Sequence, residues 1–302
     1  MLKTFTIRDC RIVEDPAGPI LVYIAPSDEE KRTLVQGCKL DEHTLASALD
    51  PDELARLEFE PEHAAAIFKR PRNYSGQDGV MFKVSSCGVF LFKDRLVIVQ
   101  AEDLPLFDGK QFNRVTTLPE VFLKLIFRSI FHFLEHLKVI NAISVELEQK
   151  INRAMENRYL INMFGLEKSL TYYVSAINSN QMLLDKLKVN QSKLGFTTEE
   201  IELLDDIVIE NNQCLKQADI HSNILASMMD ARVSVVSNNL NVLMKNLTII
   251  TIGLMVPTLV VSIFSMNVTL PLQRHPLAFW LVLGMVCVAD AVFLLLWFAR
   301  RR

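Results

Sequence analysis

Two long stretches with almost no charge, close together near the carboxyl end, constrain this chain more than any other feature. Residues 247–264 form 18 uncharged positions, and residues 277–298 form 22 positions with Asp290 as their single charge. At about 1.5 Å per helical residue the first stretch measures roughly 27 Å, close to the roughly 30 Å of a bilayer's hydrocarbon core. We therefore expect two transmembrane spans, at about 247–265 and 277–298, joined by a short loop.

The residues before the first span have the composition of a soluble body. Short runs rich in Val, Ile and Phe predict strands at 20–24, 81–85, 88–92 and 95–100. Helix-start signals predict short helices after Ser27, at 43–49 and, behind Asp50-Pro51, at 52–57. The alternation of apolar and charged residues over 1–14 is typical of a strand and not of a cleavable signal. We predict a cytoplasmic α/β domain over residues 1–115.

From Pro119 onward the strand signal disappears and long helices follow. We predict helices at 119–159 and 165–193, and a third from Thr198 that meets no Pro or Gly before Gly253. Continued to residue 264, this third helix would be about 100 Å long and would need neighbours along its length. The predicted organisation is a helical stalk domain at 116–246 and a transmembrane domain at 247–302. A coiled-coil anchor that ties a cytoplasmic domain to the membrane is the simpler alternative.

The charges flanking the spans predict their orientation. Lys245 precedes the first span and three arginines, residues 300–302, follow the second. Because cytoplasmic flanks are enriched in Lys and Arg, we expect both termini in the cytoplasm.

Several functional classes have little support. A net charge of −3 without a basic stripe argues against a nucleic-acid partner. The five cysteines, at positions 10, 38, 87, 214 and 287, are too scattered for a metal cluster or disulfide framework and are expected to be small buried residues. His132 and His136 are four apart and could bind zinc, but the apolar residues beside them favour helix packing. No catalytic triad or phosphate-binding glycine loop is apparent, so we do not expect an enzyme.

A stripe of polar and thioether residues marks the first span. Its members alternate at spacings of three and four and therefore share one helix face: Asn241, Met244, Thr248, Thr251, Met255, Thr258, Ser262 and Ser265. Leu247 lies one position off this line. Such a stripe can serve helix packing, because Ser and Thr can bond back to their own helix. Two spans cannot enclose a path, so a channel would need several identical subunits with the first span innermost.

The end of the first span resembles a known family. Phe264-Ser265-Met266-Asn267 corresponds to the Tyr-Gly-Met-Asn signature of the CorA family of divalent-cation transporters, and residues 229–232, 238–245, 247–248 and 257–258 are also similar. The resemblance implies a CorA-like funnel, an α+β membrane protein with an N-terminal cytoplasmic α/β domain, a long helical stalk and two C-terminal transmembrane helices. It also implies a homopentamer in a plasma membrane, such as the bacterial inner membrane.

The resemblance further implies roles for single residues. Ser265, Met266 and Asn267 would form the selectivity mouth, and Asp206 would belong to a regulatory metal site. The pore-lining positions would be Asp230, Asn241, Met244, Leu247, Thr248, Thr251, Met255, Thr258 and Ser262. No cofactor is implied beyond the transported and regulatory divalent cation, with magnesium the first expectation and cobalt or nickel as further cargo.

Three departures from the family pattern leave alternatives open. Ser265 replaces the signature glycine, and the loop at 268–276 has no acidic residue but contains Arg274. A zinc transporter of the same family and a non-conducting membrane scaffold or sensor are the alternative functions. The charge of Asp290 is costly inside a span. In one interpretation its carboxyl group is protonated or bonded to a first-span hydroxyl. In the other it is a second-shell carboxylate of the ion path or a proton-coupling site.

Overall fold

The computed structural model describes residues 1–73, 81–153, 157–266 and 276–300. By its contacts the chain divides into two compact units, Met1–Met229 and Asp230–Arg302. The elements of the first unit are β1 (Leu2–Arg8), β2 (Arg11–Glu14), β3 (Ile20–Ile24), α1 (Asp28–Gly37), α2 (Glu42–Leu49), β4 (Arg56–Phe59), β5 (His63–Pro71), β6 (Val84–Phe92), β7 (Leu96–Gln100), a 3-10 turn (Lys110–Phe112), α3 (Leu118–Arg153), α4 (Asn157–Val189) and α5 (Gln191–Leu194). Helix α6 (Thr198–Phe264) begins in the first unit and ends in the second, which also contains α7 (Ala278–Arg300).

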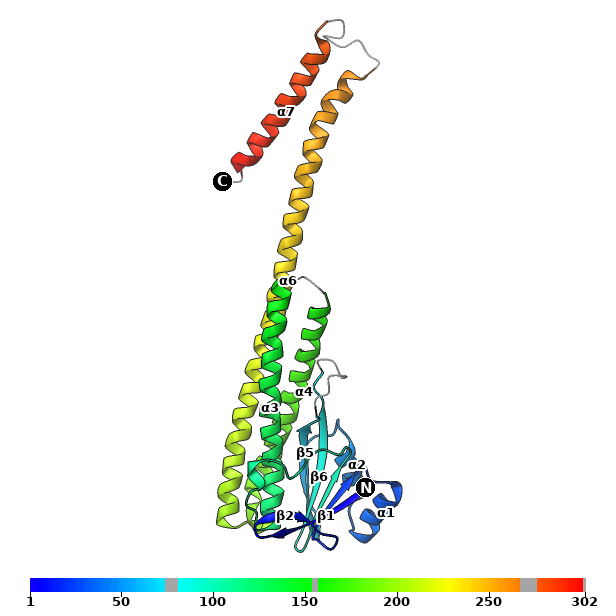
Figure 1. The fold of residues 1–302 in the computed structure, drawn as a ribbon, viewed down its shortest axis with the longest axis vertical. Coiled ribbons are helices and arrows are strands. Elements are labelled where there is room, and N and C mark those ends of the chain that lie inside the picture. Colours follow the sequence, from blue (N-terminus) through cyan, green and yellow to red (C-terminus); the bar gives the residue numbers. More distant parts are fainter. Residues whose placement is uncertain (74–80, 154–156, 267–275, 301–302) are drawn as a thin grey trace. The chain divides into compact units, whose positions relative to one another are not determined.

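The first unit is built around a seven-stranded sheet in the order β2-β1-β3-β7-β6-β5-β4. Only β3 and β7 pair in parallel among the described strands, with Val22 opposite Ile98. Helices α1 and α2 pack on one face of this sheet, and α3 and α4 pack on the other (Figure 1). The predicted α/β domain is therefore confirmed, and its core is a three-layer sandwich.

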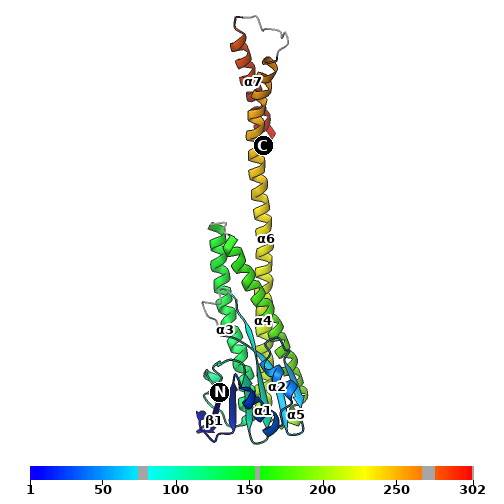
Figure 2. The same cartoon turned by 90° about the vertical axis from the view of Figure 1, so that its right-hand side faces the viewer.

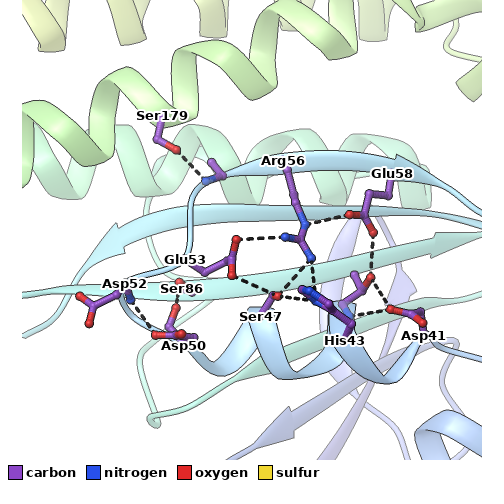
Figure 3. Close-up of polar contacts among 12 residues, drawn as sticks. Asp41, His43, Ser47, Asp50, Asp52, Glu53, Arg56, Glu58, Ser86 and Ser179 are labelled. Atoms are coloured by element: carbon purple, nitrogen blue, oxygen red, sulfur yellow. Dashed lines mark hydrogen bonds and ion pairs between the residues drawn. The ribbon is translucent and has the colours of Figure 1, made fainter.

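The prediction of a helix at 52–57 is wrong, and Figure 3 shows why. The Asp50 carboxylate accepts the backbone N–H of Asp52 at 2.9 Å, which closes a turn behind Pro51. The Ala55 N–H then donates to Ser179 Oγ of α4 at 2.6 Å, and Leu57 pairs with Ala66 in the sheet. Sheet pairing and a contact 124 residues away in sequence thus override the local helix signal.

Two neighbouring strands were also predicted incompletely. The nine residues of β5 are all buried, so the strand lacks the alternation by which a half-buried strand is recognised. Strand β6 is continuous through Gly88, where the sequence predicts two separate strands. A Cβ at Gly88 would lie 2.4 Å from the Ala48 Cβ, so glycine permits the close approach of α2.

The helices beyond the sheet differ from expectation mainly at their ends. Helix α4 starts at Asn157, eight positions before the predicted start at Gly165. A glycine inside a helix costs only about 1 kcal/mol. Met163 and Leu166 on either side of it are fully packed into the main core, and that burial outweighs the cost. Figure 2 shows the start of α6 beside α4, and Leu204, Ile207 and Cys214 of α6 join the same core.

Asn180 of α4 replaces a missing strand beside β5. The pairing with β4 ends at Ile67, which leaves the backbone of Lys69 without a partner strand on that side. The Asn180 side chain accepts the Lys69 N–H at 2.7 Å and donates to the Lys69 carbonyl at 2.8 Å. Ser129 of α3 donates to the same carbonyl at 3.0 Å. The sheet is thereby joined to both covering helices through buried hydrogen bonds.

The two neighbouring histidines of α3 are packing residues in the described fold. His136 Nδ1 lies 2.6 Å from the Tyr173 hydroxyl, and its ring packs against Phe82 and His132. Burial raises the pKa of Tyr173, so the hydroxyl that contacts the His136 ring stays protonated. Burial, together with His136, Arg70 and Arg128, lowers the pKa of His132 to about 3.

These histidines predict a loss of stability in mild acid. The pKa of His132 is lower in the folded state than its value of about 6.5 in an unfolded chain. The unfolded state therefore takes up the proton first as the pH falls below about 6.5, and the free energy of unfolding decreases by at most about 1.4 kcal/mol per pH unit per histidine. Urea midpoints at pH 7 and pH 5 should show this decrease, and His132→Asn should reduce it. An unchanged slope in the variant would contradict the assignment.

The second unit contains the carboxyl-terminal part of α6 and helix α7. Both α6 and the part of α7 over residues 278–295 are long and apolar enough to cross a membrane, by length and composition. The Lys245 ammonium lies 5.3 Å from the centre of the Trp297 ring, which places the start of the first span beside the end of the second. The two predicted spans are thus present as helices.

Cysteine burial was predicted only in part. Cys38, Cys87 and Cys214 are buried as expected, but Cys10 and Cys287 are exposed, and all five are free thiols. Burial raises the pKa of Cys87 to about 11 and that of Cys214 to about 12. These two thiols are therefore unreactive packing groups.

Candidate ion pathway

The stripe residues occupy a single exposed face of α6. Every predicted pore-lining position from Asp230 to Ser262, and Ser265 beyond them, is exposed in the chain. The residues of the span that are partly covered are Ile249, Gly253, Val256, Pro257, Val260 and Phe264. At about 100° per residue these lie on the opposite side of the helix from the stripe. The stripe is thus the exposed side of the first span.

Four hydroxyl groups of the stripe donate their hydrogen within the helix and so present their oxygens as acceptors. Thr248, Thr251 and Thr258 each donate their hydrogen to the carbonyl four residues earlier, at 2.8, 2.9 and 2.6 Å. Ser265 donates to the Ser262 carbonyl at 2.9 Å. With the hydrogen used within the helix, the lone pairs of each hydroxyl oxygen remain free. Free oxygen lone pairs are what a cation, or the water around it, can bind.

Apolar side chains alternate with these oxygens along the stripe. Met244, Leu247 and Met255 are 60%, 57% and 63% exposed, although all three are large and hydrophobic. A shallow groove on the helix surface is lined by Thr251, Met255, Thr258 and Ser262 together with Leu254 and Leu259. An uncovered mixture of thioether, aliphatic and hydroxyl groups suits a narrow path that is wet in one state and dry in another.

The two ends of the stripe differ in chemistry. Asp230 is exposed on the same face, 11 residues before Asn241, and brings a carboxylate to one end. At the other end α6 stops at Phe264, and the Ser265 N–H still bonds to the Val261 carbonyl at 3.1 Å. Ser265 does not have positive φ; the described non-glycine residues that do are Asp9, Cys10, Ala25 and Lys39. The serine therefore continues the helical hydrogen bonding for one residue past Phe264 without positive φ, and Asn267 lies outside the described residues.

Asp206, the predicted regulatory ligand, is an exposed residue of α6 in the first unit. Its neighbour Asp205 forms an ion pair with Lys188 at 2.7 Å, whereas no ion pair or hydrogen bond of the Asp206 side chain occurs within the described ranges. No group of three or more His, Cys, Asp or Glu side chains gathers within that part of the chain. A metal site at Asp206 would thus need ligands from a second subunit.

The structure adds residues that sequence reasoning passed over. Trp297 was not singled out, and its contact with Lys245 depends on how α6 and α7 pack. Asp290 lies on the partly covered side of α7, and its Oδ1 atom is buried without a hydrogen-bond partner among the described atoms. Of the alternatives for Asp290, a bond from its Oδ1 atom to a first-span hydroxyl is therefore not formed among the described atoms. These hydroxyls bond to their own helix instead.

Comparison with known proteins gives one consistent result. The family model described as CorA-like Mg²⁺ transporter protein matches residues 20–301. The cobalt/magnesium transport protein CorA of Methanocaldococcus jannaschii is 26% identical over 280 residues, covering 89% of this chain and 86% of the relative.

Solved structures show the same fold. The complete CorA magnesium transporter from Methanocaldococcus jannaschii matches with a TM-score of 0.78 at 20% identity, over 98% of this chain and 96% of the other. The full-length CmaX protein matches with a TM-score of 0.70 at 17% identity, over 99% and 96%. The family model covers all the described elements from β3 onward, including the uncovered stripe. This chain therefore belongs to the CorA family of divalent-cation transporters.

Proposed function

We propose that this transporter is a homopentameric channel that lets magnesium ions move passively down their gradient. Membership of a transporter family also means that the chain is not an enzyme. The main support for a channel is the uncovered row of oxygen acceptors that continues to Asp230 along one face of α6. Since one such face cannot enclose a path, identical faces from several subunits have to meet around an axis.

The chemistry of the stripe suits a hydrated ion. Magnesium gives up its water reluctantly, so it is best held through its water shell by carbonyl, amide and hydroxyl oxygens. In the proposed path Asn267 receives the ion at the mouth, and Thr258, Thr251 and Asn241 contact its water farther along. Met255, Leu247 and Met244 form constrictions that close by losing water. Asp230 attracts the ion to the cytoplasmic end.

Closure by cytoplasmic divalent cations is the second part of the proposal. The Asp206 carboxylate is exposed and unpaired within the described chain, so it can bind an ion together with a neighbouring subunit. Such an ion stabilises the closed state by its differential affinity for that state. Asp206→Asn should therefore raise the internal magnesium concentration needed for half inhibition of flux several-fold. Asp205→Asn, which removes a carboxylate already paired with Lys188, is the matched control and should shift it less.

The transported ion and the orientation are also part of the proposal. The relative from Methanocaldococcus jannaschii is named for cobalt and magnesium, which makes these two ions the first cargoes to test. We place both termini in the cytoplasm and the protein in a plasma membrane, because Lys245 and the arginines at 300–302 flank the two spans on one side. The acid-free loop at 268–276 keeps zinc as the alternative cargo.

Flux into liposomes tests the proposal. Purified protein is reconstituted into liposomes that enclose a magnesium- or zinc-sensitive dye. Magnesium, cobalt and zinc are then added in turn to the solution outside the liposomes. Dye responses to magnesium and cobalt, reduced by Asn267→Ala, are the expected result. A response to zinc alone would favour the zinc transporter. If no ion enters and Asn267→Ala behaves like the wild type, the chain is a non-conducting scaffold. Native mass spectrometry checks the number of subunits.

A further inference from the structure

Helices α3 and α6 begin beside each other at one end of the first unit and run from there in the same direction (Figure 1). Each start is capped by a threonine. The Thr117 hydroxyl accepts the Glu120 N–H at 3.1 Å, and the Thr197 hydroxyl accepts the Glu200 N–H at 3.3 Å. Because the amino-terminal end of a helix carries a partial positive charge, the two neighbouring ends repel each other unless a negative group lies between them.

Glu200 supplies that negative group. Its side chain is 5% exposed, so the carboxylate is buried. The Oε2 atom accepts the Thr197 N–H at the start of α6 at 2.8 Å, which completes a capping box. The Oε1 atom accepts the Thr117 hydroxyl at the start of α3 at 2.5 Å. Within the described ranges Glu200 forms no ion pair, so its charge is balanced by the two helix ends.

The hydrogen bond from Thr117 to Glu200 joins positions 83 residues apart in sequence. A cleft of about 570 Å³ lies beside it and is lined by side chains from both helix starts, including Lys124 and Leu203. Side-chain packing therefore leaves space here, and the Thr117–Glu200 contact holds the two starts together across it. A buried carboxylate that loses a partner is strongly unfavourable, so this contact resists a shift of α6 along α3.

We propose that Glu200 is a positioning residue that fixes the base of α6 to α3 and thereby holds Asp206 ready to bind the ion that closes the channel. Asp206 follows Glu200 by six residues, which is about 9 Å along the same helix. A ligand that is already held in place loses less conformational freedom on binding, so it binds at a lower ion concentration. The inference rests on the proposed function in one respect, because only that proposal makes Asp206 a gating ligand.

Thr117→Val tests the role in closure, because valine keeps the volume and removes the hydroxyl that bonds to Glu200. The internal magnesium concentration for half inhibition of liposome flux should rise about threefold. Thr116→Val is the matched control, since the Thr116 hydroxyl donates to Glu120 of its own helix start at 2.9 Å and should leave closure unchanged. Thr117→Ser restores the hydroxyl and should restore closure. Equal shifts in the two valine variants, or no recovery with serine, would overturn the proposal.

A double-mutant cycle tests the Thr117–Glu200 contact itself, on the full-length protein in one detergent. Thr117→Val should lower the apparent melting temperature of the wild type by about 6 °C, because a helix cap and the bond to Glu200 are both lost. In a Glu200→Ala background only the cap is left to lose, so the decrease should be about 3 °C. Equal decreases in both backgrounds would overturn the contact as the element that holds α6.

A second variant keeps the cycle decisive if Glu200→Ala does not fold. Glu200→Gln retains the cap on the Thr197 N–H but is neutral, and a neutral acceptor forms a weaker hydrogen bond. Thr117→Val should therefore cause a smaller decrease in the Glu200→Gln background than in the wild type. Absence of flux in the wild type would refute the proposed function, and the thermal cycle would still decide whether Glu200 joins the two helices.

Discussion

Thr258→Val should lower magnesium flux about tenfold without a comparable loss of folded protein. The threonine donates its hydrogen to the Leu254 carbonyl, so its role toward an ion rests on the exposed oxygen, which valine lacks at nearly equal volume. In a symmetric channel the change removes one acceptor from every subunit at one level of the path. A tenfold decrease corresponds to a barrier higher by about 1.4 kcal/mol, the size of one or two neutral hydrogen bonds. Dye-loaded liposomes measure the effect directly.

The chain offers a matched control three residues away. Val261→Thr makes the reverse exchange, replacing a methyl group by a hydroxyl. Residue 261 is exposed to one side of the stripe, and its new hydroxyl can bond back to its own helix. Flux through Val261→Thr should equal that of the wild type. If the two substitutions had equal effects, the stripe would be a surface for helix packing and not an ion path.

Asn180→Leu should cause a large loss of stability in the first unit. Leucine keeps the volume of the side chain but leaves the buried N–H of Lys69 without an acceptor and removes one of the two donors to its carbonyl. An unsatisfied buried backbone group costs about 1–3 kcal/mol, so we expect a loss of roughly 3 kcal/mol in the free energy of unfolding. The melting temperature of the full-length protein should fall by about 10 °C.

The control for this prediction is another asparagine that bonds to a backbone carbonyl. Asn212 on α6 donates to the Val208 carbonyl at 3.0 Å from an exposed position, where water can replace it. Asn212→Leu should change stability by less than about 0.5 kcal/mol. Hydrogen exchange at the Lys69 amide should rise sharply in Asn180→Leu alone. Unchanged protection there would show that the sheet does not depend on this contact.

Features that depend on local spacing could be predicted from the sequence. The two spans follow from charge-free length, and Ser27 forms the capping box that its sequence indicates, with Glu30 as its partner. The single face shared by Asn241 through Ser265 follows from spacings of three and four. The family could be identified from residues close together in sequence, around Ser265 and Met266. The homopentamer, the gating ion and the role of Asn267 stay predictions.

Features that depend on distant partners were decided by the tertiary structure. Strand β4 forms where a helix was predicted because Leu57 pairs with Ala66 in the sheet and the Ala55 N–H donates to Ser179. Likewise, Asn180 received its role from a sheet edge 111 residues away. The sequence showed that the first span has a polar stripe, but only the structure showed that this side of the helix is the exposed one. The physical reason is that a helix face repeats every three or four residues in the chain itself, whereas burial, sheet pairing and the fate of a buried acceptor such as Asp290 depend on groups that folding brings together.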